Sequence, residues 1–214
     1  MNEAISAHRR SSSIDRSRIV RLYVKPALFV VCLLPFLRLL LGAFEIAGMH
    51  LGTNAVETVQ DVTGQWGLRF LLITLAITPL RDWFNAPQLI QLRRMLGLYA
   101  FFYVLLHFMT WLFLDQGLYW SVIFEDIAKR PFITIGFLAF LMSIPLAVTS
   151  TNVMMRRLGK RWKYLHRLVY LITVFGVWHY WWQVKADIRE PLVYAVLTAM
   201  LLGWRLWKWA RRGS

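Results

Sequence analysis

Long apolar blocks separated by short polar segments dominate the pattern of this chain. A membrane-spanning helix needs about 20 mostly apolar residues, whereas a helix on a soluble protein keeps one polar face. Six blocks approach that length: 26–44, 66–80, 95–114, 132–150, 165–182 and 192–209. The second block is the shortest of them, and the first contains Arg38. The pattern predicts an all-α integral membrane protein, a bundle of about six transmembrane helices spanning residues 26–210.

Composition supports the same class. Of the 214 residues, 58% are hydrophobic and only 17% are charged, against about a quarter charged in a typical soluble domain. The loops are short, so we expect no second folded domain. The two longest, 45–65 and 115–131, are each predicted to hold a short interfacial helix. The sequence shows no evident internal repeat.

The basic residues decide the orientation and the class of partner. The net charge of +14 is compatible with nucleic-acid binding, but 18 of the 25 basic residues fall on one side of the predicted membrane and eight of the eleven acids on the other. Cytoplasmic loops carry the excess of Lys and Arg. We therefore predict that both termini are cytoplasmic, that residues 1–25 form a cytoplasmic basic tail, and that the partner of the basic surface is membrane lipid, with no nucleic acid bound.

Several kinds of site are excluded by the sequence. Cys32 is the only cysteine, so the chain has no internal disulfide, and no C-x-x-C-H motif for covalent haem attachment occurs. Phosphate-binding glycine loops and zinc-ligand patterns are also absent. We find no catalytic residues, so chemistry must come from a bound group or from a partner protein.

Two histidines lie at the same predicted depth. His107 follows the start of the third block by 12 residues and His179 follows His166 by 13, so both lie roughly 18–20 Å from the cytoplasmic edge. Ionisable groups inside a membrane are costly and mark functional sites. Two imidazoles on separate helices can ligate one haem iron in a bundle core. We predict a haem in the outer half of the membrane, the alternative being two hydrogen-bonded core histidines.

The inner end of the bundle offers a weaker site. His166 lies at the start of the fifth block, and the third block has Arg93 rather than a histidine at the matching depth. We expect His166 and Arg93 to form a second haem site or an electron-entry point. The alternative is a plain interfacial histidine.

Two arginines are candidate partners for haem propionates. Arg69 lies near the predicted depth of the histidine pair, and Arg38 lies in the middle of the first block. Arginine binds a carboxylate through two parallel hydrogen bonds. The alternative for Arg69 is that it extends to the outer headgroups.

Several motifs resemble one membrane family. The segments "LAITPLR", "RRMLGLYAFFYVLLH", "KRPFITIG", "LAVTST", "MRRLGKRWKYLHRLVYL" and "HYWWQVK" are similar in order and spacing to the MsrQ (YedZ) family, from about residue 60 to 205. These are haem-binding subunits of the bacterial methionine-sulfoxide reductase system MsrPQ. They belong with the ferric-reductase-like transmembrane domains, whose larger relatives hold two stacked haems between paired histidines. Arg93 stands where the inner histidine of the third block would be.

The resemblance implies a function and partners. It implies a b-type cytochrome of the bacterial inner membrane that forms a heterodimer with the periplasmic molybdopterin reductase MsrP. That enzyme, and not this chain, would be the catalyst that repairs oxidised periplasmic proteins. The implied electron donor is membrane quinol or a cytoplasmic flavin reductase, and FMN is a cofactor by resemblance only. The alternatives are a stand-alone transmembrane ferric or quinone reductase and a haem-free transporter with intramembrane His and Arg.

Overall fold

The structure is a computed structural model that describes residues 16–184 and 187–211. Most of the predicted basic tail, residues 1–15, lies outside these ranges. Within them the regular structure is helical and no strand is present. The chain is therefore an all-α protein, as the apolar pattern predicted.

Six long helices form the bundle within the described residues. They are α2 (Lys25–Ala43), α3 (Ala55–Trp83), α4 (Ile90–Met109), α6 (Pro131–Val148), α9 (Leu168–Gln183) and α10 (Arg189–Ala210). Shorter elements are η1 (Val20–Val24), η2 (Ile46–Gly48), η3 (Pro87–Leu89), η4 (Thr110–Asp115), α5 (Trp120–Lys129), α7 (Asn152–Leu158) and α8 (Lys160–Leu165). Each predicted block corresponds to one long helix, and the short helix expected in 115–131 is α5.

Two helices begin about ten residues earlier than the apolar pattern predicted. The first helix is continuous over Arg16–Ala43, so the end of the predicted tail is helical and residue 25 is not a boundary. Helix α3 begins at Ala55 because the Asn54 side chain accepts a hydrogen bond from the backbone N–H of Glu57, an N-cap. The predicted outer loop 45–65 was therefore too long. Its second half, residues 55–65, is the first three turns of α3.

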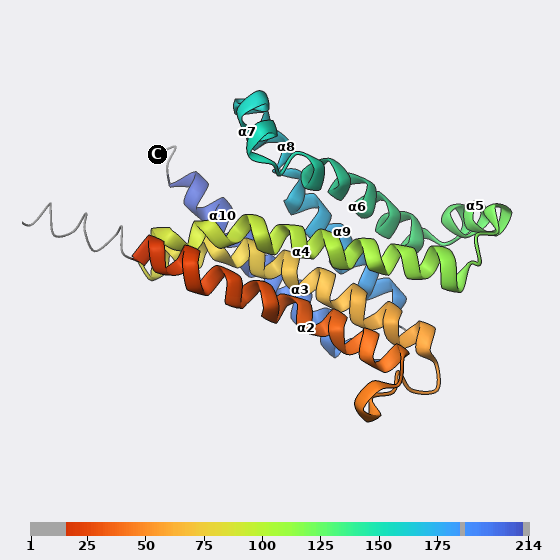
Figure 1. The fold of residues 1–214 in the computed structure, drawn as a ribbon. Helices are drawn as coiled ribbons and strands as arrows, with labels where there is room; N and C mark the ends of the chain where they lie inside the picture. Colours follow the sequence, from red (N-terminus) through yellow and green to blue (C-terminus); the bar gives the residue numbers. More distant parts are fainter. Residues whose placement is uncertain (1–15, 185–186, 212–214) are drawn as a thin grey trace, which may run out of the picture.

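The fifth block differs from its prediction at the inner end. Helix α9 begins at Leu168, and His166 lies in a turn that follows α8, not in the helix itself. Residues 152–165, which the pattern left as a loop, form α7 and α8. These two helices project from the bundle at the end where the first described residue, Arg16, and the last, Arg211, lie (Figure 1).

The helices pack mainly as two antiparallel pairs. Helix α3 lies along α4, and α6 lies along α9, with α10 against α3 and α9 and with α2 against α3 and α4 (Figure 1). We call the end that carries Arg16 and Arg211 the proximal end, and the end that carries α5 and η2 the distal end. The pairing brings four helices, α3, α4, α6 and α9, around one internal space.

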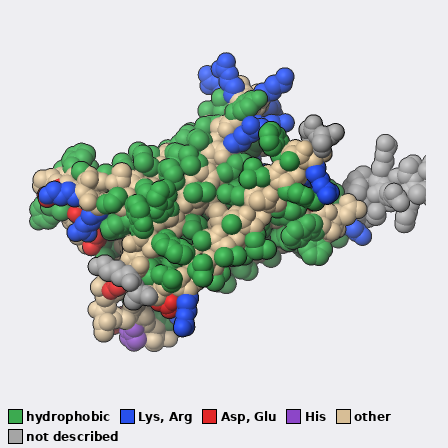
Figure 2. Space-filling model, turned by 180° about the vertical axis from the view of Figure 1, so that it is seen from behind, with side chains coloured by type: hydrophobic (Ala, Val, Ile, Leu, Met, Phe, Trp, Pro, Cys, Tyr) green, Lys and Arg blue, Asp and Glu red, His purple; other side chains and the backbone are tan. Residues whose placement is uncertain are grey.

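The outside of the bundle is apolar along its length. Large hydrophobic side chains such as Phe29, Val31, Leu141 and Met200 are exposed, and charged side chains gather towards the ends (Figure 2). In the part of the chain that the structure describes, three helical stretches alone are long and apolar enough to cross a membrane: Arg16–Ala43, Pro87–Asp115 and Pro131–Val148. An apolar surface of this extent belongs in lipid, which makes the chain a membrane protein.

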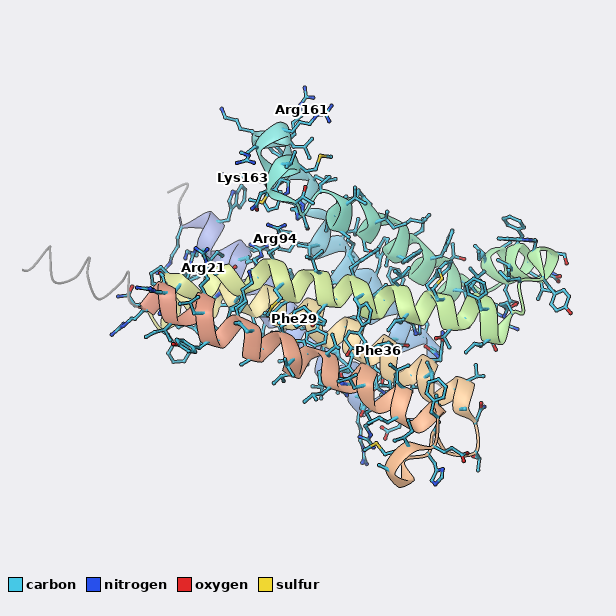
Figure 3. All side chains as sticks on the ribbon, in the orientation of Figure 1. Arg21, Phe29, Phe36, Arg94, Arg161 and Lys163 are labelled. Carbon is cyan, nitrogen blue, oxygen red and sulfur yellow. The ribbon has the colours of Figure 1, made fainter. Side chains whose placement is uncertain are left out.

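A buried tyrosine of α4 anchors α2. The hydroxyl of Tyr103, whose ring is fully buried, donates to the carbonyl of Cys32 (2.8 Å) and accepts from the N–H of Phe36 (3.1 Å). It therefore inserts into the hydrogen-bond ladder of α2 beside Pro35, which lacks an N–H. Phe29 and Phe36 lie along the same helix (Figure 3) and pack edge-on against aromatic rings of α4.

Replacing Tyr103 with Phe should loosen this contact. The ring still fills its space, but α2 loses both hydrogen bonds to α4, and interhelical hydrogen bonds in membranes contribute about 0.6–2 kcal/mol each. We expect a lower thermal unfolding temperature in detergent. Tyr23→Phe, which alters an exposed hydroxyl on the same helix, is the control and should unfold as the parent does. Equal unfolding temperatures for all three proteins would contradict the prediction.

Candidate functional site

A large cavity lies between α3, α4, α6 and α9. Its volume is about 690 Å³, within the range of small-molecule and cofactor sites. Its interior is apolar, with Leu68, Phe140 and Ile172 among the lining side chains. Polar residues line the part formed by the helix ends at the distal end of the bundle: Asn54, Glu57, Asp61, Asp115, Arg130 and Gln183. The cavity therefore combines a dry interior with a polar mouth.

His107 enters the cavity from α4. Its Nδ1 lies 2.9 Å from the backbone carbonyl of Gln60 on α3. A carbonyl can only accept, so Nδ1 carries the proton and Nε2 keeps its lone pair. The Gln60 side-chain Nε2 lies 3.4 Å from His107 Nε2, and the amide oxygen of Gln60 is buried without a hydrogen-bond partner. An unpaired buried amide oxygen is costly and is typical of a site that binds a group.

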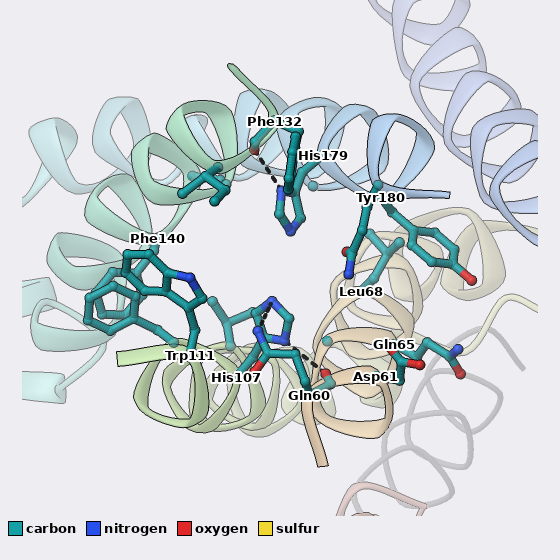
Figure 4. Close-up of a pocket in the computed structure, with 18 of the residues that line it drawn as sticks. Gln60, Asp61, Gln65, Leu68, His107, Trp111, Phe132, Phe140, His179 and Tyr180 are labelled. Carbon is teal, nitrogen blue, oxygen red and sulfur yellow. Dashed lines mark hydrogen bonds between the residues drawn. The ribbon is translucent and has the colours of Figure 1, made fainter. Parts of the chain in front are cut away.

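His179 enters from α9 in the same way. Its Nδ1 lies 2.7 Å from the carbonyl of Phe132 on α6, so its Nε2 also keeps its lone pair. The two imidazoles point towards one another across the cavity (Figure 4), with ring centres 6.0 Å apart and planes at 79°. The matched depth read from the sequence therefore corresponds to a real juxtaposition of His107 and His179.

His166 lies elsewhere. It is not among the residues that line the cavity, and its Nε2 is 3.1 Å from the Thr149 hydroxyl. Its ring stacks on Trp162 at 3.9 Å between centres. Burial, and to a lesser degree the positive charge of Arg93, lowers the pKa of the His166 imidazole to about 4. The large cavity does not extend to them.

The two arginines predicted as propionate partners are also outside the cavity lining. Arg69 donates from Nε to the Tyr194 hydroxyl (2.9 Å) and from a terminal nitrogen to the side-chain oxygen of Gln65 (3.0 Å). Its guanidinium also lies over the Trp66 ring. Arg38 is exposed on the outer surface of the bundle. Neither arginine therefore lines the cavity, and their role as propionate partners stays a prediction.

Sequence reasoning missed three kinds of residue at this site. Arg130, the N-cap residue of α6, is the one Arg or Lys side chain of the described residues that lines the cavity. Gly64 and Gly136 let the helix backbones approach the two imidazoles. Gln60 contacts His107 from the polar turns of α3 that were taken as a loop. Of these, only Arg130 and Gly136 lie in a motif, "KRPFITIG", that could have drawn attention to them.

Comparisons with known proteins identify the family of this chain. Residues 63–177 match the model of the family described as ferric reductase like transmembrane component. A protein from Ralstonia nicotianae, named protein-methionine-sulfoxide reductase heme-binding subunit MsrQ, is 52% identical over 195 residues, covering 89% of this chain and 88% of the relative. Proteins of the same name from Xanthomonas campestris pv. campestris and Xanthomonas oryzae pv. oryzae are each 55% identical over 158 residues, or 74% of this chain and 72% of theirs. No solved structure matches the chain.

The family match covers both cavity histidine helices up to Val177, and the relatives extend it over most of the chain. With identity above one half across this length, shared descent and a shared fold follow. The chain belongs to the MsrQ family of protein-methionine-sulfoxide reductase heme-binding subunits, within the ferric-reductase-like transmembrane components.

Proposed function

We propose that the chain is a b-type membrane cytochrome that passes electrons across the bacterial inner membrane to a methionine-sulfoxide reductase. One observation carries the proposal: two imidazoles with unprotonated Nε2 atoms face each other across a cavity of about 690 Å³. The alternative of two core histidines does not explain the space between them, because packed interiors leave few voids larger than a water molecule.

The residues fit a haem. Imidazole nitrogens bind first-row metal ions at about 2 Å, so two rings that share one ion have centres roughly 6 Å apart. The rings of His107 and His179 are separated by 6.0 Å. The backbone carbonyls of Gln60 and Phe132 fix the tautomer of each ligand, the usual task of groups that surround a metal site.

A haem held there supplies reversible one-electron chemistry. The chain itself binds the iron through His107 and His179, orients both rings through backbone carbonyls, and keeps water from the interior with apolar side chains. The polar mouth leaves one edge of the site accessible at the distal end. Electron delivery therefore takes place at that end.

The charge distribution supports an orientation. Arg21, Arg94, Arg161 and Lys163 lie towards the proximal end (Figure 3), whereas acidic residues such as Glu57 line the distal mouth. Basic loops stay in the cytoplasm. We therefore propose that the proximal end and both termini are cytoplasmic and that the cavity lies in the outer half of the inner membrane. We propose that α3, α9 and α10 also cross the membrane, packed with the three more apolar stretches Arg16–Ala43, Pro87–Asp115 and Pro131–Val148.

The family supports the partner. MsrQ relatives are named as subunits of a protein-methionine-sulfoxide reductase. We propose that the catalytic subunit is the periplasmic molybdopterin reductase MsrP, and that quinol or a cytoplasmic flavin reductase donates the electrons. FMN stays a cofactor by resemblance only. Membership in a family of haem-binding subunits counts against the haem-free transporter, and the subunit name counts against the stand-alone reductase.

A visible spectrum tests the proposal. The protein, purified in detergent after expression with a haem supply, should give the difference bands of a b-type cytochrome when dithionite-reduced and oxidised samples are compared. Its haem content, determined after extraction with pyridine, should be at least one per chain. Absence of haem under conditions that load another membrane cytochrome would overturn the proposal.

Arg130 should retain the haem through a propionate. It is the cationic side chain at the mouth of the cavity, and its Nε lies 3.2 Å from Oδ1 of Asp126. Because the side chain is 57% exposed, it has room to reorient and bind a haem propionate as well. Charge-assisted hydrogen bonds contribute about 1.5–3 kcal/mol, so Arg130→Gln should weaken haem affinity by about tenfold or more. Arg69→Leu and Arg38→Leu, at the two positions predicted from sequence, serve as comparisons. A larger loss of haem affinity in either of these variants than in Arg130→Gln would favour Arg69 or Arg38 as the propionate partner.

His166 should act at the electron-entry side, as a site for a second haem or for the donor. Its imidazole and Arg93 lie towards the proximal end, away from the cavity. We expect His166→Ala to leave the His107–His179 haem bound but to slow its reduction by quinol several-fold. Thr149→Val, which removes the hydroxyl partner of His166 but keeps the ring, is the control. Unchanged haem stoichiometry and an unchanged reduction rate in His166→Ala would leave His166 as an interfacial residue of the α8–α9 turn.

A further inference from the structure

Helices α3 and α4 carry a three-part arrangement around one imidazole. His107 on α4 bonds to the carbonyl of Gln60 on α3, and Gly64 lies one turn further along α3. A Cβ atom built on Gly64 would lie 2.9 Å from Nδ1 and 3.0 Å from Cε1 of His107. The edge of the ring that carries Nδ1 and Cε1 thus lies against a position of α3 that has no side chain.

Helices α6 and α9 repeat this arrangement 72 residues later. His179 bonds to the carbonyl of Phe132, and a Cβ atom on Gly136 would lie 2.7 Å from its Nδ1 and 2.9 Å from its Cε1. In both pairs the histidine follows its carbonyl partner by 47 residues. The sequence shows no evident repeat because the residues between these points differ. The duplication is in the geometry.

Separations below 3.0 Å are essentially never seen for real Cβ atoms, so an alanine at either glycine would push the imidazole away. The ring has little room to yield. Its Nδ1 is tied to the carbonyl one turn back on the same helix, and any rotation that relieves the collision breaks that bond or turns Nε2 away from the opposite ring. Glycine is the residue that permits such a close backbone approach.

We propose that Gly64 and Gly136 are positioning residues for the two haem ligands: they fix the direction of both Nε2 lone pairs and so the strength of ligation and the potential of the iron. This inference rests on the proposed function. The two glycines touch no ligand themselves and act through His107 and His179.

Close helix packing is the competing explanation, because small residues let membrane helices approach. Gly67 separates the two explanations. A Cβ on Gly67 would lie 2.8 Å from the Cγ2 atom of Val104, a collision of similar size on the same helix that involves no histidine. Gly203 on α10 has no neighbour within 4 Å and serves as the unperturbed control.

The test compares four purified variants, Gly64→Ala, Gly136→Ala, Gly67→Ala and Gly203→Ala, in haem content, midpoint potential and the electron paramagnetic resonance of the ferric state. We expect Gly136→Ala, which makes the closer contact, to lose most of its haem. Gly64→Ala should lose less but show a shifted potential and altered resonance positions. Gly67→Ala should unfold at a lower temperature while its remaining haem keeps the parent resonance. Parent haem content, potential and resonance in both Gly64→Ala and Gly136→Ala would overturn the inference.

A second comparison keeps the test decisive if an alanine variant folds poorly. In His179→Gly, imidazole added to the buffer can take the place of the missing ring, and it is free to shift because no helix tethers it. Adding Gly136→Ala to that background should therefore reduce haem binding far less than in the parent, and an equal loss would count against positioning. The outcomes also separate the two proposals. Absence of haem from the parent protein defeats the proposed function, whereas haem that depends on His107 and His179 but ignores the glycines defeats only this inference.

Discussion

Replacing either His107 or His179 with Ala is expected to abolish stable haem binding. In the proposed site each ring would supply one of two protein ligands to the same iron. The described residues hold no group of three or more His, Cys, Asp or Glu side chains that could bind a metal ion instead. Mutation of groups that merely support a ligand already costs 10- to 100-fold in metal affinity, so loss of the ligand itself should cost at least about 100-fold.

The measurement is haem per chain after purification, together with the reduced-minus-oxidised spectrum. His50→Ala, at an exposed histidine of the distal loop, is the matched control and should keep its haem in full. His107→Met and His179→Met ask a finer question, since a thioether can bind haem iron and raises its potential. Full haem retention in both alanine variants would mean that the imidazole pair is not the ligand set.

Electron delivery should fail together with the haem. We expect vesicles that contain the chain and the periplasmic reductase to reduce methionine sulfoxide when quinol is supplied, and His179→Ala to lower the rate by at least about 100-fold, in parallel with its loss of haem. Without the bound group the chain carries no redox-active side-chain pair, because Cys32 is the only cysteine.

The same vesicles test whether the chain acts only as a conduit. The isolated reductase, given an artificial soluble electron donor, should run at the same rate in the presence of parent or His179→Ala protein. If His179→Ala supports quinol-driven turnover at the parent rate, the electrons travel by another route. If the chain alone reduces ferric chelates or quinone at a comparable rate, the stand-alone reductase is the better description.

The apolar pattern predicted the bundle because helices that contact lipid need long stretches of apolar residues. Helices α2, α4 and α6 lie in the three most apolar helical stretches, and the observed bounds of α6, Pro131–Val148, nearly coincide with the predicted 132–150. Helix α3 was placed too late because its first two turns carry residues such as Glu57 and Asp61 that face the polar mouth. A helical segment whose side chains face a polar cavity instead of lipid is as polar in sequence as a loop, so the apolar pattern does not detect it.

Only part of the candidate site could be predicted from the sequence. The equal depth of His107 and His179 could be predicted because residue spacing along a helix gives the distance from its end. Gly64 and Gly136 carry no such signal, since a glycine acquires its meaning only from the ring that lies against it. Arg130 was taken as a loop cation because its role depends on where α6 begins. The turn at His166 was missed because the fifth block was started at residue 165, although Arg167 interrupts its apolar residues.

The location of the iron tests the central claim most directly. A map of anomalous scattering at the iron absorption edge, or a high-resolution electron cryomicroscopy map of the haem-loaded protein, would place the metal without reference to activity. The proposed function predicts iron between α4 and α9 in the distal half of the bundle, about 2 Å from the Nε2 atoms of both His107 and His179. Iron bound at any other pair of residues, or beyond bonding distance of either histidine, would contradict it.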